Sequence, residues 1–317
     1  MKILFVVLLL AAALQAPAQR LFEQYSRRTD SLRIGPDAHL PGQHQGYTVA
    51  LPDTGMARGV LLFLEEERPD PTKPEVLLHR EANAAGWAVV RVSTGIPVDF
   101  YFSPASLRFV DTTLRRLWAA HPLPRNNVYL VGAGMSGHRA LVFLRYRAKQ
   151  PQPLFVVRGL VLCESAIDWV RQWYEEKKAV RDNFFPSAVF SGEMVSYLLE
   201  QNLKGTPKNR LEAYLQFSGY SYFDERMRHL ALLEGLRVRA YSEPATHYWM
   251  EQRGKGTFDT NFPDMVGLIT ELQLRGNKDA ELVLFHQDKH LKDRRNPNYT
   301  WGLVEKRELM DWIRRGR

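Results

Sequence analysis

The 317-residue sequence contains a single cysteine, Cys163, so no disulfide can form within the chain. Cys163 ends the apolar run Gly159–Cys163, and a thiol in such a run is typical of a small buried side chain rather than of a reactive one. The chain has no Gly/Ser-rich or Pro-rich linker, no low-complexity tract and no internal repeat. We therefore expect residues 19–317 to form one domain, because α/β folds of this length are often a single unit.

The apolar run near the N-terminus, Ile3–Ala13, is shorter than the ~20 residues that span a bilayer. The basic residue Lys2 precedes it and the motif Ala16-Pro17-Ala18 follows it, which predicts a signal peptide over residues 1–18 with cleavage after Ala18. No cysteine follows this motif to take a lipid anchor. We expect a periplasmic or secreted protein without stable membrane insertion.

Acidic residues are fewer than basic ones, 35 Asp and Glu against 43 Lys and Arg, which gives a formal net charge of +8. In an exported protein, a basic surface favours anionic glycans, lipid headgroups or cell-wall polymers over nucleic acid as partners. Basic and acidic residues also alternate in stretches such as Trp173–Asp182, which is typical of a solvated helix face. We expect no nucleic-acid partner.

Apolar runs bounded by turn residues alternate with amphipathic stretches, which predicts an α/β fold with a mostly parallel sheet and crossover helices. The runs Val60–Leu64 and Val128–Val131 are continuously apolar, as expected for strands that are covered on both faces. Helices are expected over Ser106–Ala120 and from Leu303 to the C-terminus. The expected strands are Gly46–Leu51, Gly59–Leu64, Trp87–Val92, Asn127–Gly132, Gly159–Cys163, Leu236–Tyr241 and Glu281–Phe285.

About 70 residues separate two of these strands, and the stretch from roughly 166 to 235 is predicted to be a helical cap over the edge of the sheet. Aromatic residues are dense in this stretch. Most of them are expected in the core, and a subset could line an apolar ligand pocket, because open α/β sheets bind ligands at the carboxyl ends of their strands.

The segment Val128–Leu141 has the context of a nucleophile elbow, G-x-S-x-G, in which a tight turn from strand to helix exposes the nucleophile. Two registers compete. If Gly132 is the first glycine, Gly134 stands at the nucleophile position and Ser136 replaces the second glycine. If Gly134 is the first glycine, Ser136 is the nucleophile and His138 replaces the second glycine. The first register is favoured, because Gly132 directly follows the strand and His138 is too bulky for close backbone packing.

This segment resembles the G-x-S-M-G-G-H-x-A-L elbow of the esterase-D-like and dipeptidyl-peptidase-like members of the α/β-hydrolase superfamily. The resemblance implies the α/β-hydrolase fold and an ancestral serine hydrolase activity on esters or peptides. Glycine at position 134 has no side chain that can attack a carbonyl, so only the Met135 N–H remains as the expected oxyanion donor. His138 belongs to the helix packing in these families. The matching residues are Gly132, Met135, Gly137, His138, Ala140 and Leu141.

In this superfamily the acid and the base follow the nucleophile, after the last two strands. The segment Ser242–Trp249 resembles the E-P-D segment of exported bacterial hydrolases, with Ala245 at the Asp position and the carboxylate of Glu243 as a possible substitute. The segment Asn296–Glu305 resembles their P-H-S-W-S segment, with Tyr299 at the His position. The expected triad positions therefore read Gly134, Ala245 and Tyr299.

Hydrolases of this type commonly carry a His-Gly oxyanion segment after the expected strand Gly59–Leu64, whereas this chain has Glu65 and Glu66 there. Adjacent carboxylates would repel a developing oxyanion, although acids at a strand end can simply be solvated. Trp249 and Trp301, in the acid and base segments, are expected to line the cleft.

Three side chains, His286, Asp288 and His290, stand at every second position. In an extended segment they would share one face and could bind zinc or another divalent ion, but polar residues after a strand often bind no metal. In a working enzyme, His286 or His290 could instead act as base to Ser136, with Glu243 as the acid.

Three hypotheses follow. The first is a non-catalytic α/β-hydrolase-fold protein without a cofactor, which binds a small molecule, a glycan or a protein at the former active-site cleft. The second is an active serine esterase or peptidase with Ser136 as nucleophile. The third is a metal-dependent hydrolase or metal-binding protein that uses His286, Asp288 and His290.

Overall fold

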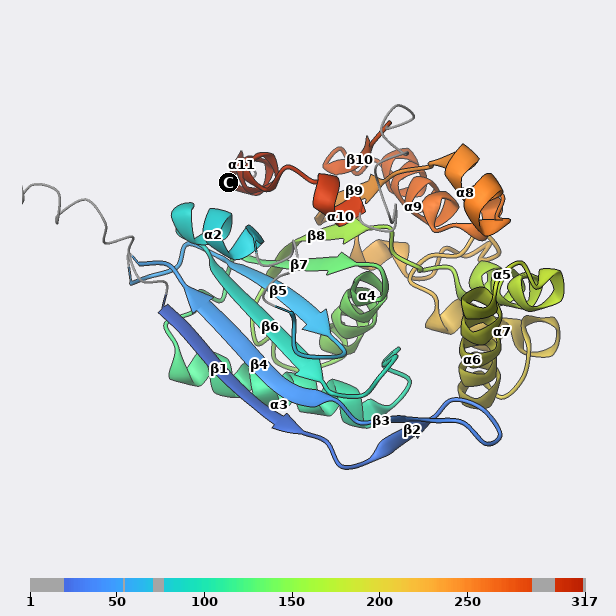
Figure 1. Cartoon of the computed structure of the whole chain (residues 1–317). Helices are drawn as coiled ribbons and strands as arrows, with labels where there is room; N and C mark the ends of the chain where they lie inside the picture. Colours follow the sequence, from blue (N-terminus) through green and yellow to red (C-terminus); the bar gives the residue numbers. More distant parts are fainter. Residues whose placement is uncertain (1–19, 54, 71–76, 287–299, 316–317) are drawn as a thin grey trace, which may run out of the picture.

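The computed structural model describes residues 20–53, 55–70, 77–286 and 300–315, so the predicted signal peptide lies outside the described residues. An eight-stranded sheet runs through the molecule in the order β1-β4-β6-β5-β7-β8-β9-β10 (Figure 1). The pairs β1–β4 and β4–β6 are antiparallel and the remaining neighbours are parallel, which confirms the mostly parallel sheet. The strands are β1 (Arg20–Arg27), β4 (His44–Leu51), β5 (Val60–Glu65), β6 (Ala88–Thr94), β7 (Val128–Ala133), β8 (Val157–Cys163), β9 (Arg237–Ser242) and β10 (Ala280–Leu284).

All seven expected strands overlap strands of this sheet, from β4 to β10. The edge strand β1 and the small hairpin of β2 (Ser31–Arg33) and β3 (His39–Pro41) were not predicted. Seven of the eight residues of β1 are exposed and the eighth is only half-buried. A strand that buries so little apolar surface lacks the apolar run on which the sequence prediction depends.

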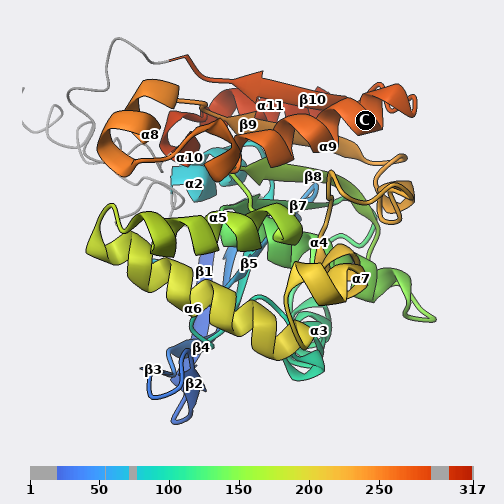
Figure 2. The same ribbon diagram turned by 90° about the vertical axis from the view of Figure 1, so that its right-hand side faces the viewer.

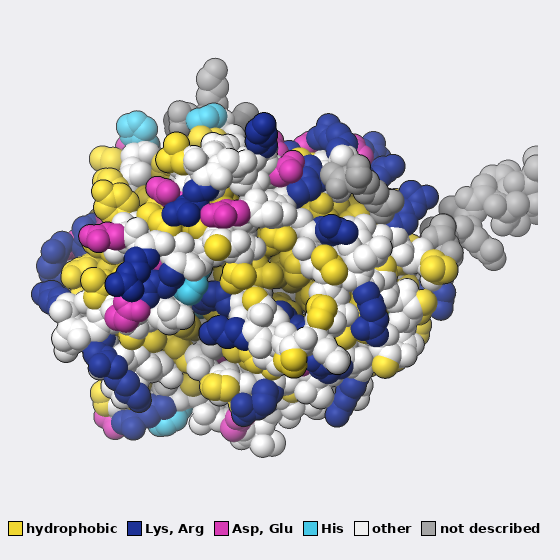
Figure 3. All heavy atoms as spheres, turned by 180° about the vertical axis from the view of Figure 1, so that it is seen from behind, with side chains coloured by type: hydrophobic (Ala, Val, Ile, Leu, Met, Phe, Trp, Pro, Cys, Tyr) yellow, Lys and Arg dark blue, Asp and Glu magenta, His cyan; other side chains and the backbone are white. Residues whose placement is uncertain are grey.

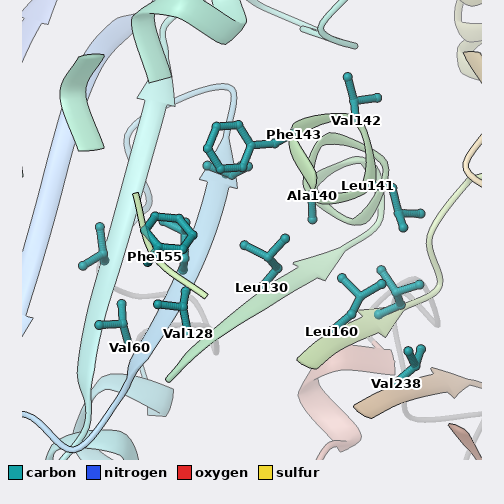
Figure 4. Close-up of a cluster of buried hydrophobic side chains, with 14 of the residues drawn as sticks. Val60, Val128, Leu130, Ala140, Leu141, Val142, Phe143, Phe155, Leu160 and Val238 are labelled. Carbon is teal, nitrogen blue, oxygen red and sulfur yellow. The ribbon is translucent and has the colours of Figure 1, made fainter. Parts of the chain in front are cut away.

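Helices cover both faces of the sheet, and each face has its own core. Figure 4 shows part of the first core, where Val128 and Leu130 of β7 and Leu160 of β8 face Ala140 and Phe143 of α4. The helix predicted from Leu303 to the C-terminus is instead two helices, α10 and α11. One face carries α3 (Pro104–Ala120), α4 (Met135–Ala148) and α9 (Phe262–Leu274), and the other carries α2 (Leu77–Ala84), α10 (Thr300–Leu303) and α11 (Lys306–Arg315).

The stretch 166–235 holds three α-helices that lie across the carboxyl ends of the parallel strands (Figures 1 and 2). A third apolar cluster joins them, and its buried members include Trp169, Leu199 and Tyr214. Ile34, which directly follows β2, is also buried in this cluster. We call these three helices the cap helices: α5 (Trp169–Asp182), α6 (Pro186–Leu203) and α7 (Pro207–Phe217). After β9 the chain adds α8 (Thr246–Arg253) and the short helix η3 (Thr257–Asp259) beside them.

Lys and Arg side chains are spread over the face seen in Figure 3 among hydrophobic and uncharged atoms, as expected for a chain of net charge +8. In the described part of the chain, no helix is both long and apolar enough to cross a membrane.

Candidate functional site

The turn from β7 to α4 is sharp, and Gly134 forms its corner. Gly134 has φ 56° and ψ −126°, a backbone conformation that costs a residue with a side chain about 1–3 kcal/mol. Its N–H donates to the Cys163 carbonyl of the neighbouring strand β8 at 2.8 Å. A Cβ at this position would have no atom within 4 Å. A side chain at this corner would therefore project into open space, which is the geometry an elbow nucleophile needs.

The two other glycines of this turn, Gly132 and Gly137, have no room for a side chain. A Cβ on Gly132 would lie 2.3 Å from the Gly137 nitrogen, and a Cβ on Gly137 would lie 2.0 Å from Ser165 Oγ. Ser136 is buried, and its Oγ accepts from Ala133 N at 2.9 Å and donates to Ala133 O at 3.0 Å. The Ser136 hydroxyl is thus bound within the turn.

A cavity of about 540 Å³ lies in front of this elbow. The carboxyl ends of β7, β8 and β9 form one side of it, and the cap helices α5 and α6 form the other, with further residues from α8 to η3. Four residues expected at the site line this cavity, namely Gly134, Glu243, Trp249 and Trp301.

The charged side chains that line the cavity are mostly acidic. Glu164 comes directly after β8, and its Oε1 accepts from Ser242 Oγ at 2.8 Å, from Thr300 Oγ1 at 3.3 Å and from the Glu243 N–H. Burial raises the pKa of Glu164, although these hydrogen bonds lower it in part. The lining carboxylates are Glu164, Glu175, Glu176, Glu243 and Asp259, and the lining basic residues are Arg253 and Lys255.

Two consecutive acids of α5, Glu175 and Glu176, are buried at the cavity wall. The Gln172 Nε2 amide joins them, donating to Glu175 Oε2 at 2.8 Å and to Glu176 Oε1 at 2.7 Å. Lys255 forms an ion pair with Glu175. Burial, together with the charge of Glu175, raises the pKa of Glu176 well above its usual value, so the wall favours the protonated form of the Glu176 carboxyl.

Several of the other expected site residues lie away from this cavity. Ala245 is buried at the start of α8 with φ 39° and ψ 41°. Met135 begins α4 and packs against the cluster formed by the cap helices. Glu65 accepts from Arg91 Nη1 at 2.8 Å, and Glu66 accepts from Arg139 Nη1 at 3.4 Å. None of Ala245, Met135, Glu65 and Glu66 lines the cavity.

The candidates for a base or a metal ligand come from the segment after β10. His286 is exposed, whereas Asp288, His290 and Tyr299 lie outside the described residues. Among the residues that the structure describes, no three His, Cys, Asp or Glu side chains form a metal-binding group.

His138 is buried between α4 and the cap. Its Nδ1 accepts from the Trp169 indole N–H at 2.9 Å, which places the ring proton on Nε2, 3.2 Å from the Phe100 carbonyl that it faces. Burial lowers the pKa of His138 well below its usual value. The neutral ring is therefore fixed as a link between the elbow helix and the cap.

Four of the cavity carboxylates, Glu164, Glu175, Glu176 and Asp259, were missed by sequence reasoning. Glu164 had a usable signal, because it directly follows the expected strand Gly159–Cys163 and polar residues at the carboxyl ends of parallel strands tend to meet. Glu175 and Glu176 had none, since they stand in a charged stretch that has the composition of a solvated helix face.

No protein-family model matches this chain, and no curated protein sequence does. Several solved structures, however, are similar to this chain. An acylaminoacyl peptidase of Pyrococcus horikoshii is similar over 93% of this chain, with a TM-score of 0.56 and 11% identity. An esterase of Pyrobaculum calidifontis is similar over 98% of this chain and 86% of its own, with a TM-score of 0.53 and 12% identity.

A carboxylesterase cloned from a metagenomic library is similar over 97% of this chain and 92% of its own, with a TM-score of 0.54 and 13% identity. The chain spans 42% of the length of the acylaminoacyl peptidase. Likenesses at such low identities establish a shared fold, so the activity has to be argued from the site itself.

Proposed function

We propose that this chain, which has the α/β-hydrolase fold, is a non-catalytic protein that binds a small-molecule ligand in the cavity at its elbow. The observation that carries the proposal is Gly134, which forms the corner of the elbow, lines the cavity and has no side chain. A serine hydrolase needs a side-chain oxygen at this corner and a base to activate it. Among the described residues that line the cavity there is no histidine.

The cavity has properties that suit a ligand. Its volume of about 540 Å³ falls within the range of roughly 300–1,000 Å³ of small-molecule sites. It also lies at the carboxyl ends of parallel strands, where α/β sheets usually bind ligands. With the segment 1–18 as a signal peptide, we place the binding protein in the periplasm or outside the cell.

An active esterase or peptidase that uses Ser136 is the competing function. The Ser136 hydroxyl is buried and bound to both backbone groups of Ala133, and Ser136 does not line the cavity. An attack on a substrate would first require this turn to open.

Covalent labelling separates the two functions. The mature protein is incubated with a fluorophosphonate probe, and p-nitrophenyl acetate hydrolysis is measured in parallel for the wild type and for Ser136→Ala. We expect no labelling, and equal background hydrolysis in both proteins. Labelling of the wild type that is lost in Ser136→Ala would overturn the proposal.

Ligand binding is tested by filling the cavity. Ser191 of α6 lines the cavity and is half-buried, whereas Gln201 of the same helix is exposed and does not line it. A library of small amines, acids, sugars and neutral esters is screened by thermal shift. We expect compounds that stabilise the wild type and Gln201→Trp but not Ser191→Trp. If no compound binds, or if Ser191→Trp retains all binding, the elbow cavity is not the binding site.

A further inference from the structure

We propose that residues 246–255 form a lid over the elbow cavity, and that the ion pair between Lys255 and Glu175 holds this lid closed. This inference rests on the proposed binding function, because it concerns how a ligand reaches the same cavity. It is argued from the anchoring of the two ends of the lid, the exposure of α8 and the contacts between the lid and the cap helices.

Both ends of the lid are anchored to one residue, Glu164. Before the lid, Ser242 Oγ donates to Glu164 Oε1 at 2.8 Å. After the lid, Asn261 Nδ2 donates to the Glu164 carbonyl at 3.0 Å, and Asp259 pairs with Lys178 of α5. The chain therefore leaves the sheet and returns to the same point, so the lid can move without a change in the strands.

The helix of the lid, α8, is held by little burial. Five of its eight residues are exposed, and the other three, Tyr248, Trp249 and Arg253, are half-buried. A segment with few buried contacts opens at a lower free-energy cost than the core does. Trp249 and Arg253 line the elbow cavity, and α8 lies beside α5 in Figures 1 and 2. Displacement of α8 would therefore open one wall of the cavity.

The residue before α8 is in a strained conformation. Ala245 has φ 39° and ψ 41°, in the left-handed region that residues other than glycine rarely adopt. A rotation of the backbone at this residue would move α8 and relax the strain. At the other end of the lid, Gly256 follows Lys255 and is exposed. Ala245 and Gly256 are thus the two hinge positions, because hinges are a few residues at the ends of an element.

An ion pair holds the lid against α5. Lys255 Nζ pairs with Glu175, whose side chain is 3% exposed, and Gln172 Nε2 donates to Glu175 Oε2 at 2.8 Å. The Arg253 guanidinium adds a second contact, 5.0 Å from the ring centre of Phe185 at the start of α6. A buried carboxylate without its counter-ion is costly, and movement of the lid would take Lys255 away. The ion pair therefore favours the closed position.

Access to the cavity can be measured without any ligand. Ala188 of α6 is buried and lines the cavity together with Arg253 and Lys255. Ala188→Cys is made in a Cys163→Ala background, and its modification by fluorescein maleimide is timed at pH 7. Gln201→Cys, at an exposed position of the same helix, gives the rate of an open site. We expect Ala188→Cys to react at least about tenfold more slowly, and equal rates would show a permanently open cavity and overturn the lid.

Lys255→Met tests the ion pair. It keeps the apolar stem of the side chain but leaves Glu175 buried without a cation, so Ala188→Cys should react at least about tenfold faster. Lys177→Met is the matched control, because it removes an ion pair between α5 and Glu200 of α6 and should leave the rate unchanged. An unchanged rate in Lys255→Met, or an equal increase in both variants, contradicts the inference.

A double substitution shows whether Lys255 acts through Glu175. Glu175→Gln removes the charge that Lys255 neutralises, and Lys255→Met should then have no further effect on the modification of Ala188→Cys. A further increase as large as that in the wild-type background would assign another partner to Lys255. The ion pair with Glu175 would then not be the contact that closes the lid.

Hydrogen exchange separates movement of the lid from unfolding of the whole domain. In Lys255→Met, the amides of β7 and β8 should exchange as slowly as in the wild type. Exchange that accelerates there as much as the modification of Ala188→Cys would show that the whole fold opens, and would overturn the lid. Because no ligand enters these measurements, a ligand screen without hits refutes the proposed binding function and leaves the lid standing.

Discussion

At the scale of single residues, burial decides the charge state of the cap acids. The pKa of Glu176 is raised to about 8 in the folded protein, whereas an unfolded glutamate has a pKa of about 4.3. Folding therefore favours the protonated carboxyl. Its contribution to stability is complete below about pH 4 and is lost as the pH rises through 8.

Glu176→Gln should abolish this pH dependence, because glutamine stays neutral. At pH 9 the variant should be more stable than the wild type, because the wild type must then either bury a second carboxylate beside Glu175 or keep Glu176 protonated against the solvent pH. At pH 4 the two proteins should be nearly equal. Urea unfolding across this pH range measures the difference. A variant that is less stable than the wild type at pH 9 would show that the carboxylate form is the one that folding favours.

His138 is the second residue whose role can be measured directly. His138→Phe keeps a ring of similar size but leaves the Trp169 indole N–H and the Phe100 carbonyl without their partner. Each unsatisfied buried group costs about 1–3 kcal/mol, so we expect a loss of about 2–4 kcal/mol in urea unfolding at pH 7. His247 is exposed, and His247→Phe should change stability by less than about 0.5 kcal/mol. Equal effects of the two substitutions would refute a linking role for His138.

At the scale of elements, the elbow requires two of its glycines for different reasons, one for its backbone conformation and the other for lack of space. Gly134 has the strained φ of 56° but open space, whereas Gly132 would place a Cβ 2.3 Å from the Gly137 nitrogen. Gly134→Ala should therefore cost about 1–3 kcal/mol through backbone strain alone. Gly132→Ala must push β7 and α4 apart and should cost at least about 3 kcal/mol. Chemical denaturation of both variants gives the order, and a larger loss for Gly134→Ala would contradict this account of the turn.

The elements that the sequence predicted are those with continuous apolar runs. The central strands β5, β6 and β7 were expected because most of their residues are apolar and nearly all are buried, on both faces of the sheet. Strand β1 was missed because its residues are mostly exposed at the sheet edge. The break between α10 and α11 was missed because Leu303 and Met310, seven residues apart, keep a helical spacing across it.

Only those residues of the candidate site that lie in a recognisable local sequence segment could be predicted. The elbow could be located from its glycines, and Glu243, Trp249 and Trp301 from the segments after the last strands. The pairing of Glu175 with Lys255 joins positions 80 residues apart. Such contacts depend on how the cap packs onto the sheet, which local sequence patterns do not encode.

At the scale of the whole molecule, the cap is joined to the helices of the sheet through one buried acid. Asp264 of α9 is 1% exposed, and Arg171 of α5 donates to its Oδ1 at 2.5 Å and to its Oδ2 at 3.0 Å. The N–H groups of Ile167 and Asp168, at the start of the cap, also donate to its Oδ2, each at 3.0 Å. The cap helix α5, which lines the cavity, is therefore bound to the sheet helix α9 through Asp264.

Asp264→Ala should loosen the cap before it unfolds the sheet. The substitution leaves Arg171 buried without its counter-ion, which costs about 3–5 kcal/mol, and it frees two N–H donors at the entry of α5. Hydrogen exchange should accelerate in α5, α6 and α7 more than in β5, β7 and β8, and binding in the elbow cavity should weaken because α5, which lines it, moves. Asp311 is about half exposed, so Asp311→Ala serves as the control with unchanged exchange. If exchange in Asp264→Ala instead rises equally in the cap and in the central strands, the cap and the sheet unfold as one cooperative unit and Asp264 stabilises both alike.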